Sequence, residues 1–120
     1  MLYDTECWAI KSQQEHKLSI TEIRILQWMS RHTRLDRIRN DYIREKVGVA
    51  PIEEKMVESR LRWFGHVMRR PIEAPVRRVD RVFDSSIARG RERPRKTIRE
   101  TVKNDLNLNV LHEDMVYDRV

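Results

Sequence analysis

Apolar residues recur at helical spacing over residues 14–30, and they extend almost all the way around the helix axis. A helix that is apolar on most sides usually lies at the centre of a bundle. We therefore expect this helix to be the central one, with Trp28 buried. The apolar positions are Leu18, Ile20, Ile23, Ile25, Leu26, Trp28 and Met29.

A second, shorter helix is predicted over residues 40–47, with Ile43 facing inward. Asn40 belongs to the residue types that cap helix N-termini, so we expect it to cap this helix. Gly48 supplies the stop, because glycine readily adopts the left-handed conformation that often follows a helix.

A third helix is predicted over residues 51–69. Proline fits the first position of a helix, where its missing N–H is not needed, and Pro51 is placed there. Glu53 and Glu54 then fall in the first turn, where the helix dipole favours anions. Pro71 ends the helix because proline cannot continue it.

On a helical wheel, residues 52–70 separate into an apolar side and a polar stripe. The apolar side seats the helix against the first two helices, so we expect Trp63 and Phe64 to be buried together with Ile43. The apolar side comprises Ile52, Met56, Val57, Leu61, Trp63, Phe64, Val67 and Met68. The polar stripe comprises Lys55, Ser59, Arg62, His66 and Arg69.

Beyond the third helix, residues 71–96 hold three of the four prolines and end in a run rich in Arg and Lys. Such a segment has little apolar surface to offset the entropy of ordering, so we expect a mobile linker. Thr97 is predicted to cap a further short helix, in which Ile98, Val102, Asp105 and Leu106 recur at helical steps.

The expected fold is therefore all-α, with four successive parts. A lead-in covers residues 1–13, a three-helix bundle covers 14–70, and the basic linker covers 71–96. A short helical segment over 97–120 follows, and we expect it to continue beyond the sequence.

Charge is distributed unevenly along this pattern. The net charge is +6 and the sequence pI is near 9.9, which suits an anionic partner. Residues 31–70 carry eleven Lys or Arg against six Asp or Glu, and residues 71–103 carry ten against five. Residues 1–30 and 104–120 are net negative. Positive potential concentrated in the middle of the chain indicates a polyanion lying across it.

Several classes of function find no support in the residues. Cys7 has no second cysteine to pair with, and no apolar run approaches a membrane span, which indicates the nucleus or cytoplasm. The four histidines are dispersed, and no phosphate loop or nucleophile motif is present. Asp105 and the pair Glu113–Asp114 lie in a polar tail without evident partners. We expect no catalytic residue, metal, cofactor, membrane contact or small-molecule substrate.

The polar stripe of residues 52–70 and the Arg/Lys-rich run at the end of the linker both have ordinary explanations as well. A charged helix face is more often solvated than functional, and a single histidine such as His66 is more often structural than catalytic. A Lys/Arg-rich run binds nucleic acid, acts as a nuclear-import signal, or is a plain flexible tail.

Three stretches also carry a family resemblance: "MLYDTECWAI", "RLDRIRNDYIREKVGVAPIEEKMVESRLRWFGHVMRRP" and "RGRERPRKTIRETVKNDL". Together they resemble the C-terminal part of reverse transcriptases from non-long-terminal-repeat (LINE-type) retrotransposons, especially plant copies. The resemblance implies a thumb-like bundle and a basic extension that help to hold template and primer. The palm with its catalytic aspartates is not part of the matching region, so a non-catalytic fragment is implied.

Two positions depart from the family pattern. Asp4 stands where the family usually has glycine, and Glu92 interrupts a stretch that in the family resembles an AT-hook. A minor-groove hook needs the flat Gly-Arg-Pro core, so AT-specific binding is not expected.

The function expected from these observations is weak, sequence-independent binding of an RNA or DNA backbone. A helical protein-interaction remnant, in which residues 31–70 contact an acidic protein surface, is the alternative. RNA or DNA preference and oligomeric state stay open. The candidate nucleic-acid-binding residues are Lys55, Arg62, His66, Arg69, Arg70, Arg89, Arg91, Arg93, Arg95 and Lys96.

Overall fold

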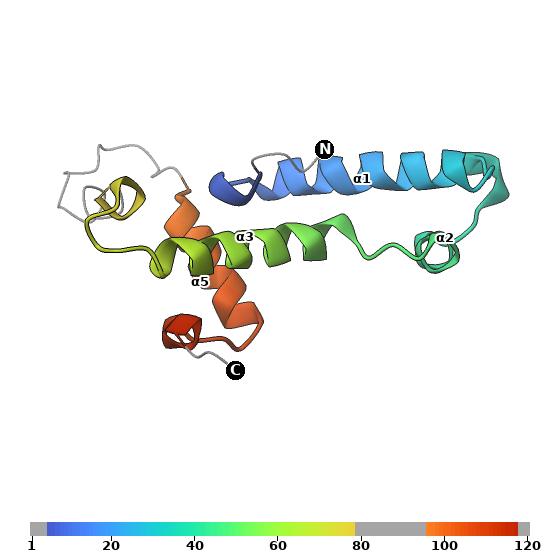
Figure 1. Ribbon diagram of the computed structural model, residues 1–120. Coiled ribbons are helices and arrows are strands. Elements are labelled where there is room, and N and C mark those ends of the chain that lie inside the picture. Colours follow the sequence, from blue (N-terminus) through green and yellow to red (C-terminus); the bar gives the residue numbers. More distant parts are fainter. Residues whose placement is uncertain (1–4, 79–95, 118–120) are drawn as a thin grey trace. The chain divides into compact units, whose positions relative to one another are not determined.

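The protein is described by a computed structural model over residues 5–78 and 96–117 (Figure 1). All regular elements in these ranges are helical and none is a strand, so the predicted all-α class is confirmed. The α-helices are α1 (Ser12–Met29), α2 (Asn40–Val47), α3 (Ile52–Met68) and α5 (Ile98–Leu108), and the 3-10 helices are η1 (Thr5–Cys7), η2 (Arg34–Asp36) and η3 (Glu113–Tyr117).

The chain forms two compact units, Ile10–Glu58 and Ser59–Val120, the second also including the N-terminal residues to Ala9. Helix α3 contributes its first turns to one unit and the remainder to the other. Each unit has a core of its own.

In the Ile10–Glu58 unit, α1 packs against α2. Ile23 and Leu26 of α1 contact Ile43 of α2, which is fully buried as predicted. Beside this cluster, Arg44 donates a hydrogen bond from Nη2 to Oε2 of Glu22 at 2.9 Å. A buried carboxylate is stable only when it is paired in this way.

Trp28 is not buried, and the prediction for it is wrong: 80% of its surface is exposed. The buried residues of α1 are Glu22, Ile23 and Leu26, which form one narrow strip. Within the described residues, the element packed against α1 is the eight-residue α2, which covers only that strip. The apolar residues of α1 therefore extend over more of its surface than α2 covers.

The C-terminal end of α2 agrees with the sequence prediction, and its N-terminal end does not. Gly48 adopts the left-handed conformation at φ 73°, and its N–H donates to the carbonyl of Arg44 at 2.8 Å, so the predicted stop is confirmed. The N-cap is Arg39 rather than Asn40, which is the first helical residue, and no side chain caps this end.

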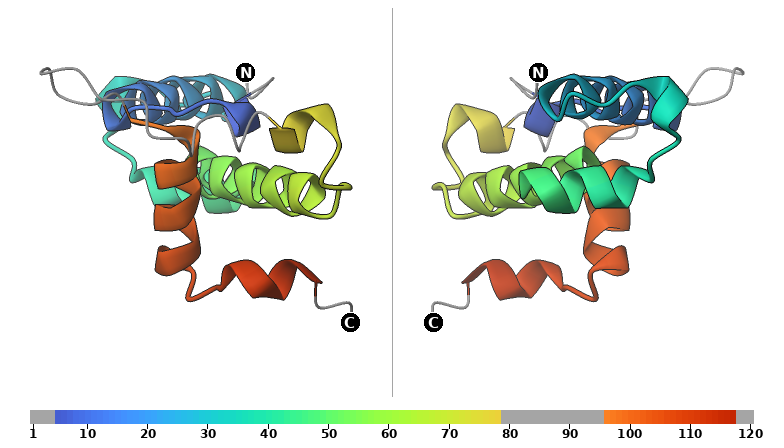
Figure 2. Two further views of the ribbon diagram at one scale, coloured as in Figure 1. Left: turned by 90° about the vertical axis from the view of Figure 1, so that its left-hand side faces the viewer. Right: turned by 90° about the vertical axis from the view of Figure 1, so that its right-hand side faces the viewer.

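In the unit that begins at Ser59, α5 crosses the C-terminal half of α3 (Figures 1 and 2). The predicted cap of α5 is confirmed, because the Thr97 hydroxyl accepts from the Glu100 N–H at 3.3 Å. Its buried residues are Thr101, Val102, Asp105 and Leu106. Trp63 and Phe64 of α3 are half-buried rather than fully buried.

Asp105 has a partner, contrary to the sequence prediction. Arg60 of α3 donates from Nε to its Oδ2 at 2.6 Å, and both residues are buried. The two residues are 45 positions apart, so the pair is made by helix packing and leaves no signal in local sequence.

The predicted mobile linker spans residues 71–96. Of this segment, residues 71–78 are described, and residues 75–78 are helical. Residues 79–95 lie outside the described residues, so the prediction of mobility remains a prediction there.

Candidate nucleic-acid interface

Four of the predicted binding residues lie together at the C-terminal end of α3. Arg62, His66, Arg69 and Arg70 are all exposed and belong to the same compact unit. Steps of four, three and one residues keep them on neighbouring parts of the helix surface. Cations near a helix C-terminus are also favoured by the helix dipole, so their position has a structural contribution of its own.

Arg69 is held in place by two features of the backbone. Its Nη1 donates to the carbonyl oxygen of Val116 at 3.4 Å. Its guanidinium group lies over Gly65, where an added Cβ would stand 3.5 Å from Nη1. The Tyr117 hydroxyl also donates to the carbonyl of Met68, at 3.3 Å. These contacts tie η3 to the end of α3.

Arg70 contacts His66. Its Nε and Nη2 lie 3.3 and 3.1 Å from Nε2 of the imidazole. A guanidinium group has only donors, so Nε2 acts as the acceptor in this contact. His66 and Arg70 therefore hold each other beside the end of α3.

Lys55 lies in the other compact unit, Ile10–Glu58. Its Nζ is 3.1 Å from Oε2 of Glu58, in an exposed i, i+3 pair. The carboxylate offsets part of the lysine charge, so a polyanion gains less from Lys55 than from a lysine without this pair.

The remaining predicted residues lie outside or at the edge of the described ranges. Lys96 is exposed and directly precedes the Thr97 cap of α5. The other four, which are Arg89, Arg91, Arg93 and Arg95, lie outside the described residues.

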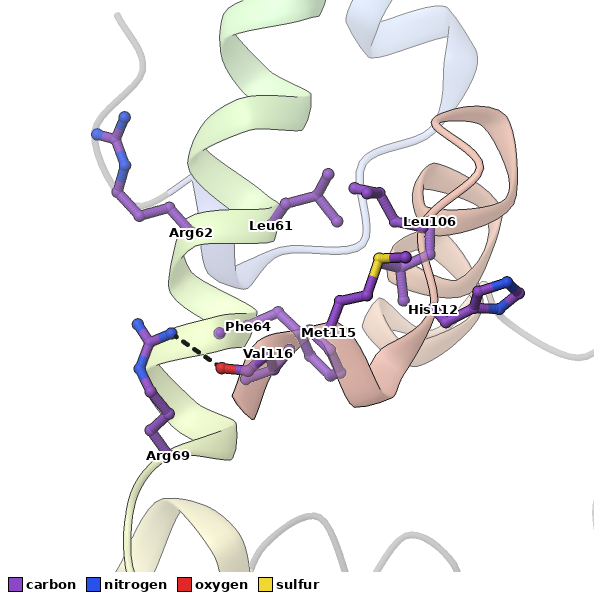
Figure 3. Close-up of a pocket in the computed structure, with 10 residues that line it drawn as sticks. Leu61, Arg62, Phe64, Arg69, Leu106, His112, Met115 and Val116 are labelled. Atoms are coloured by element: carbon purple, nitrogen blue, oxygen red, sulfur yellow. Dashed lines mark hydrogen bonds between the residues drawn. The ribbon is translucent and has the colours of Figure 1, made fainter. Parts of the chain in front are cut away.

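A pocket of about 380 Å³ lies beside the arginines, between the second half of α3, the end of α5 and η3 (Figure 3). Its apolar lining consists of Leu61, Phe64, Leu106, Leu111, Met115 and Val116. Arg62, Gly65, Arg69 and His112 complete the lining. Three separate elements meet here, and the sequence contained no signal for this pocket.

The charged side chains that line the pocket are all basic. None of its ten residues is Asp, Glu, Asn or Gln, while two are arginines. The lining therefore combines apolar surface with two arginines.

Comparisons of the chain with protein-family models, curated proteins and solved structures found no match. Within residues 5–78 and 96–117, no helix is both long and apolar enough to cross a bilayer. In the same ranges, no three His, Cys, Asp or Glu side chains cluster where they could hold a metal ion.

Proposed function

We propose that the chain binds the sugar–phosphate backbone of nucleic acid, weakly and without sequence preference. The observation that carries this proposal is the group of exposed arginines Arg62, Arg69 and Arg70 at one end of α3, beside a pocket that lacks acidic lining residues. Arginine suits phosphate because its planar guanidinium group makes two parallel hydrogen bonds to the phosphate oxygens.

The net charge of +6 and its concentration in residues 31–103 support the same conclusion. The resemblance to the C-terminal part of LINE-type reverse transcriptases supports the proposal as well. In that family a thumb and a basic extension help to hold template and primer. Under this proposal the chain is a non-catalytic fragment of such a protein, because the resemblance covers the thumb region and not the palm.

The test replaces Arg62 and Arg69 with Gln, which removes both charges and keeps helix propensity. Binding of a labelled DNA duplex of arbitrary sequence is measured by fluorescence anisotropy over a range of salt concentrations. Each phosphate contact that is lost reduces the slope of log affinity against log salt by about 0.9 on duplex DNA. We expect a weaker affinity and a slope that is shallower by up to about 1.8 for the double variant.

Lys55→Gln is the matched control, since it removes one exposed cation from the same helix. Because Glu58 already pairs with Lys55, we expect a smaller change in slope than for the double variant. If the double variant, shown by circular dichroism to be folded, binds with unchanged affinity and slope, the arginines form only a solvated face and the proposal is wrong.

A second candidate function is protein interaction, and exposed apolar residues favour it. Ile25, Trp28 and Leu35 are exposed in the Ile10–Glu58 unit, and 90% of the surface of Leu35 is accessible. Exposed apolar groups mark protein contacts where they form one contiguous patch. Duplex binding that is absent, or that does not vary with salt, would favour this candidate over nucleic-acid binding.

A further inference from the structure

We propose that the pocket between α3, α5 and η3 holds one unpaired base of a single-stranded nucleic acid, with flanking phosphates on Arg62 and Arg69. This inference rests on the proposed function and narrows it to a substrate class. It implies that single strands bind more tightly than duplexes, because a base that is paired and stacked in a helix cannot enter a pocket.

The apolar part of the pocket suits the face of a base. Leu61, Phe64 and Leu106 come from two crossing helices, and Met115 projects toward them from η3 (Figure 3). Met115 remains 47% exposed, so its thioether side chain offers apolar surface to a ligand. Every base presents a flat face that can be buried against such surface, whatever its identity.

The cations lie where a strand could run past the pocket. Figure 3 shows Arg62 and Arg69 along one side of α3, with Leu61, Leu106 and Met115 on the other side. The two arginines are seven positions apart, which corresponds to about 10 Å along the helix axis. Gly65 lies between them in the wall, where an added Cβ would stand 3.5 Å from Arg69 Nη1. A strand can thus keep its phosphates on the arginines while one base turns into the pocket.

The size of the pocket favours a base over an amphipathic helix. A docked helix needs a groove that receives side chains at i, i+3 or i+4, and i+7. A volume of about 380 Å³ is at the lower end of small-ligand pockets, which span roughly 300–1,000 Å³. It accommodates one flat group rather than a row of anchors.

The lining also indicates little discrimination among bases. Specific reading of a base edge uses bidentate side chains, above all Arg to guanine and Asn or Gln to adenine. Of these types the ten lining residues include Arg62 and Arg69, whose side chains lie on the other side of α3 from the apolar part of the pocket (Figure 3). We therefore expect any base to be accepted.

The test uses the full chain, a labelled oligodeoxythymidine and a labelled DNA hairpin duplex, with binding followed by fluorescence anisotropy. Met115→Gln keeps the length of the side chain and replaces its thioether by an amide. We expect tighter binding to the single strand than to the duplex. We expect the variant to weaken single-strand binding roughly five-fold, the effect of losing part of one buried apolar side chain, and to leave duplex binding unchanged.

Met29→Gln is the matched control, because Met29 is also exposed but lies in the other compact unit. It should change neither affinity. Thermal unfolding confirms that both variants fold, as expected for substitutions at exposed positions.

Equal binding of single strand and duplex, or an unchanged single-strand affinity in Met115→Gln, would overturn the inference and leave the proposed backbone binding intact. Absence of binding to both probes would overturn both.

Discussion

Arg60 and Asp105 form a buried ion pair that joins α3 to α5, with Nε of the arginine 2.6 Å from Oδ2 of the carboxylate. The side chains are only 3% and 8% exposed. A buried pair of this kind specifies how two helices meet, because neither charge tolerates the interior without the other. It also positions α5, whose Leu106 lines the pocket.

Asp105→Asn should destabilise the unit that begins at Ser59 by about 3–5 kcal/mol, because it removes the carboxylate charge of a buried ion pair. The free energy of unfolding is measured by urea denaturation followed by circular dichroism. Asp114→Asn removes an exposed carboxylate from the same unit and should change stability by less than about 0.5 kcal/mol. The double variant Arg60→Met, Asp105→Leu should recover much of the loss, and a double variant as unstable as Asp105→Asn would contradict this account.

Ile43→Ala should cost about 2–5 kcal/mol, because Ile43 is fully buried against Ile23 and Leu26 and its removal leaves a cavity. Ile25→Ala provides the matched control on α1, since Ile25 is exposed and its truncation creates no cavity. Chemical denaturation of the two variants gives the comparison. Similar losses at the two positions would show that the α1–α2 contact is not the core of this unit.

The two described helix-associated glycines should respond to alanine with opposite signs. Gly48→Ala should destabilise by about 1–2 kcal/mol, because φ at Gly48 is 73° and a Cβ is strained in the left-handed region. Gly65→Ala should stabilise by up to about 1 kcal/mol, since alanine has the higher helix propensity. The added Cβ would meet Arg69 Nη1 at 3.5 Å, an ordinary contact. Thermal melts of both variants check the two signs, and a loss of stability in Gly65→Ala would reveal a steric conflict at α3.

The pKa of Asp36 is lowered, first by the Thr33 backbone N–H and then by the Thr33 hydroxyl, which donate to Oδ2 at 2.6 and 3.1 Å. Because the folded-state pKa is the lower one, this carboxylate stabilises the fold above its ordinary value of 3.8, and the contribution is lost as the pH falls through the lowered value. A carboxyl-carbon NMR titration should detect the lowered pKa. Thr33→Ala should move it part of the way back, since the backbone donor remains. An Asp36 pKa at or above 3.8 in the unmodified chain would exclude the cap.

Much of the helical order was predictable because it depends on residues within a few positions of one another. The Gly48 stop and the Thr97–Glu100 cap each involve contacts across three or four residues, which a sequence displays directly. The periodicity around Ile43 similarly identified a buried position.

The candidate site was predictable only in part. Arg62 and Arg69 fell on one side of a predicted helix, and they do lie on an exposed side of α3. The anchoring of Arg69 by Val116 and the pairing of Lys55 with Glu58 depend on side-chain geometry, so spacing did not indicate either.

Sequence by itself determined the end of α2 at Gly48 and the start of α5 at Thr97, since hydrogen bonds at helix caps are made between near neighbours. Tertiary packing decided which apolar residues are covered and which charges are buried. Trp28 is exposed because α2 covers only one strip of α1, although its neighbours along the chain are apolar. Asp105 meets Arg60 because α5 crosses α3, and no local pattern encodes a contact between residues 45 positions apart.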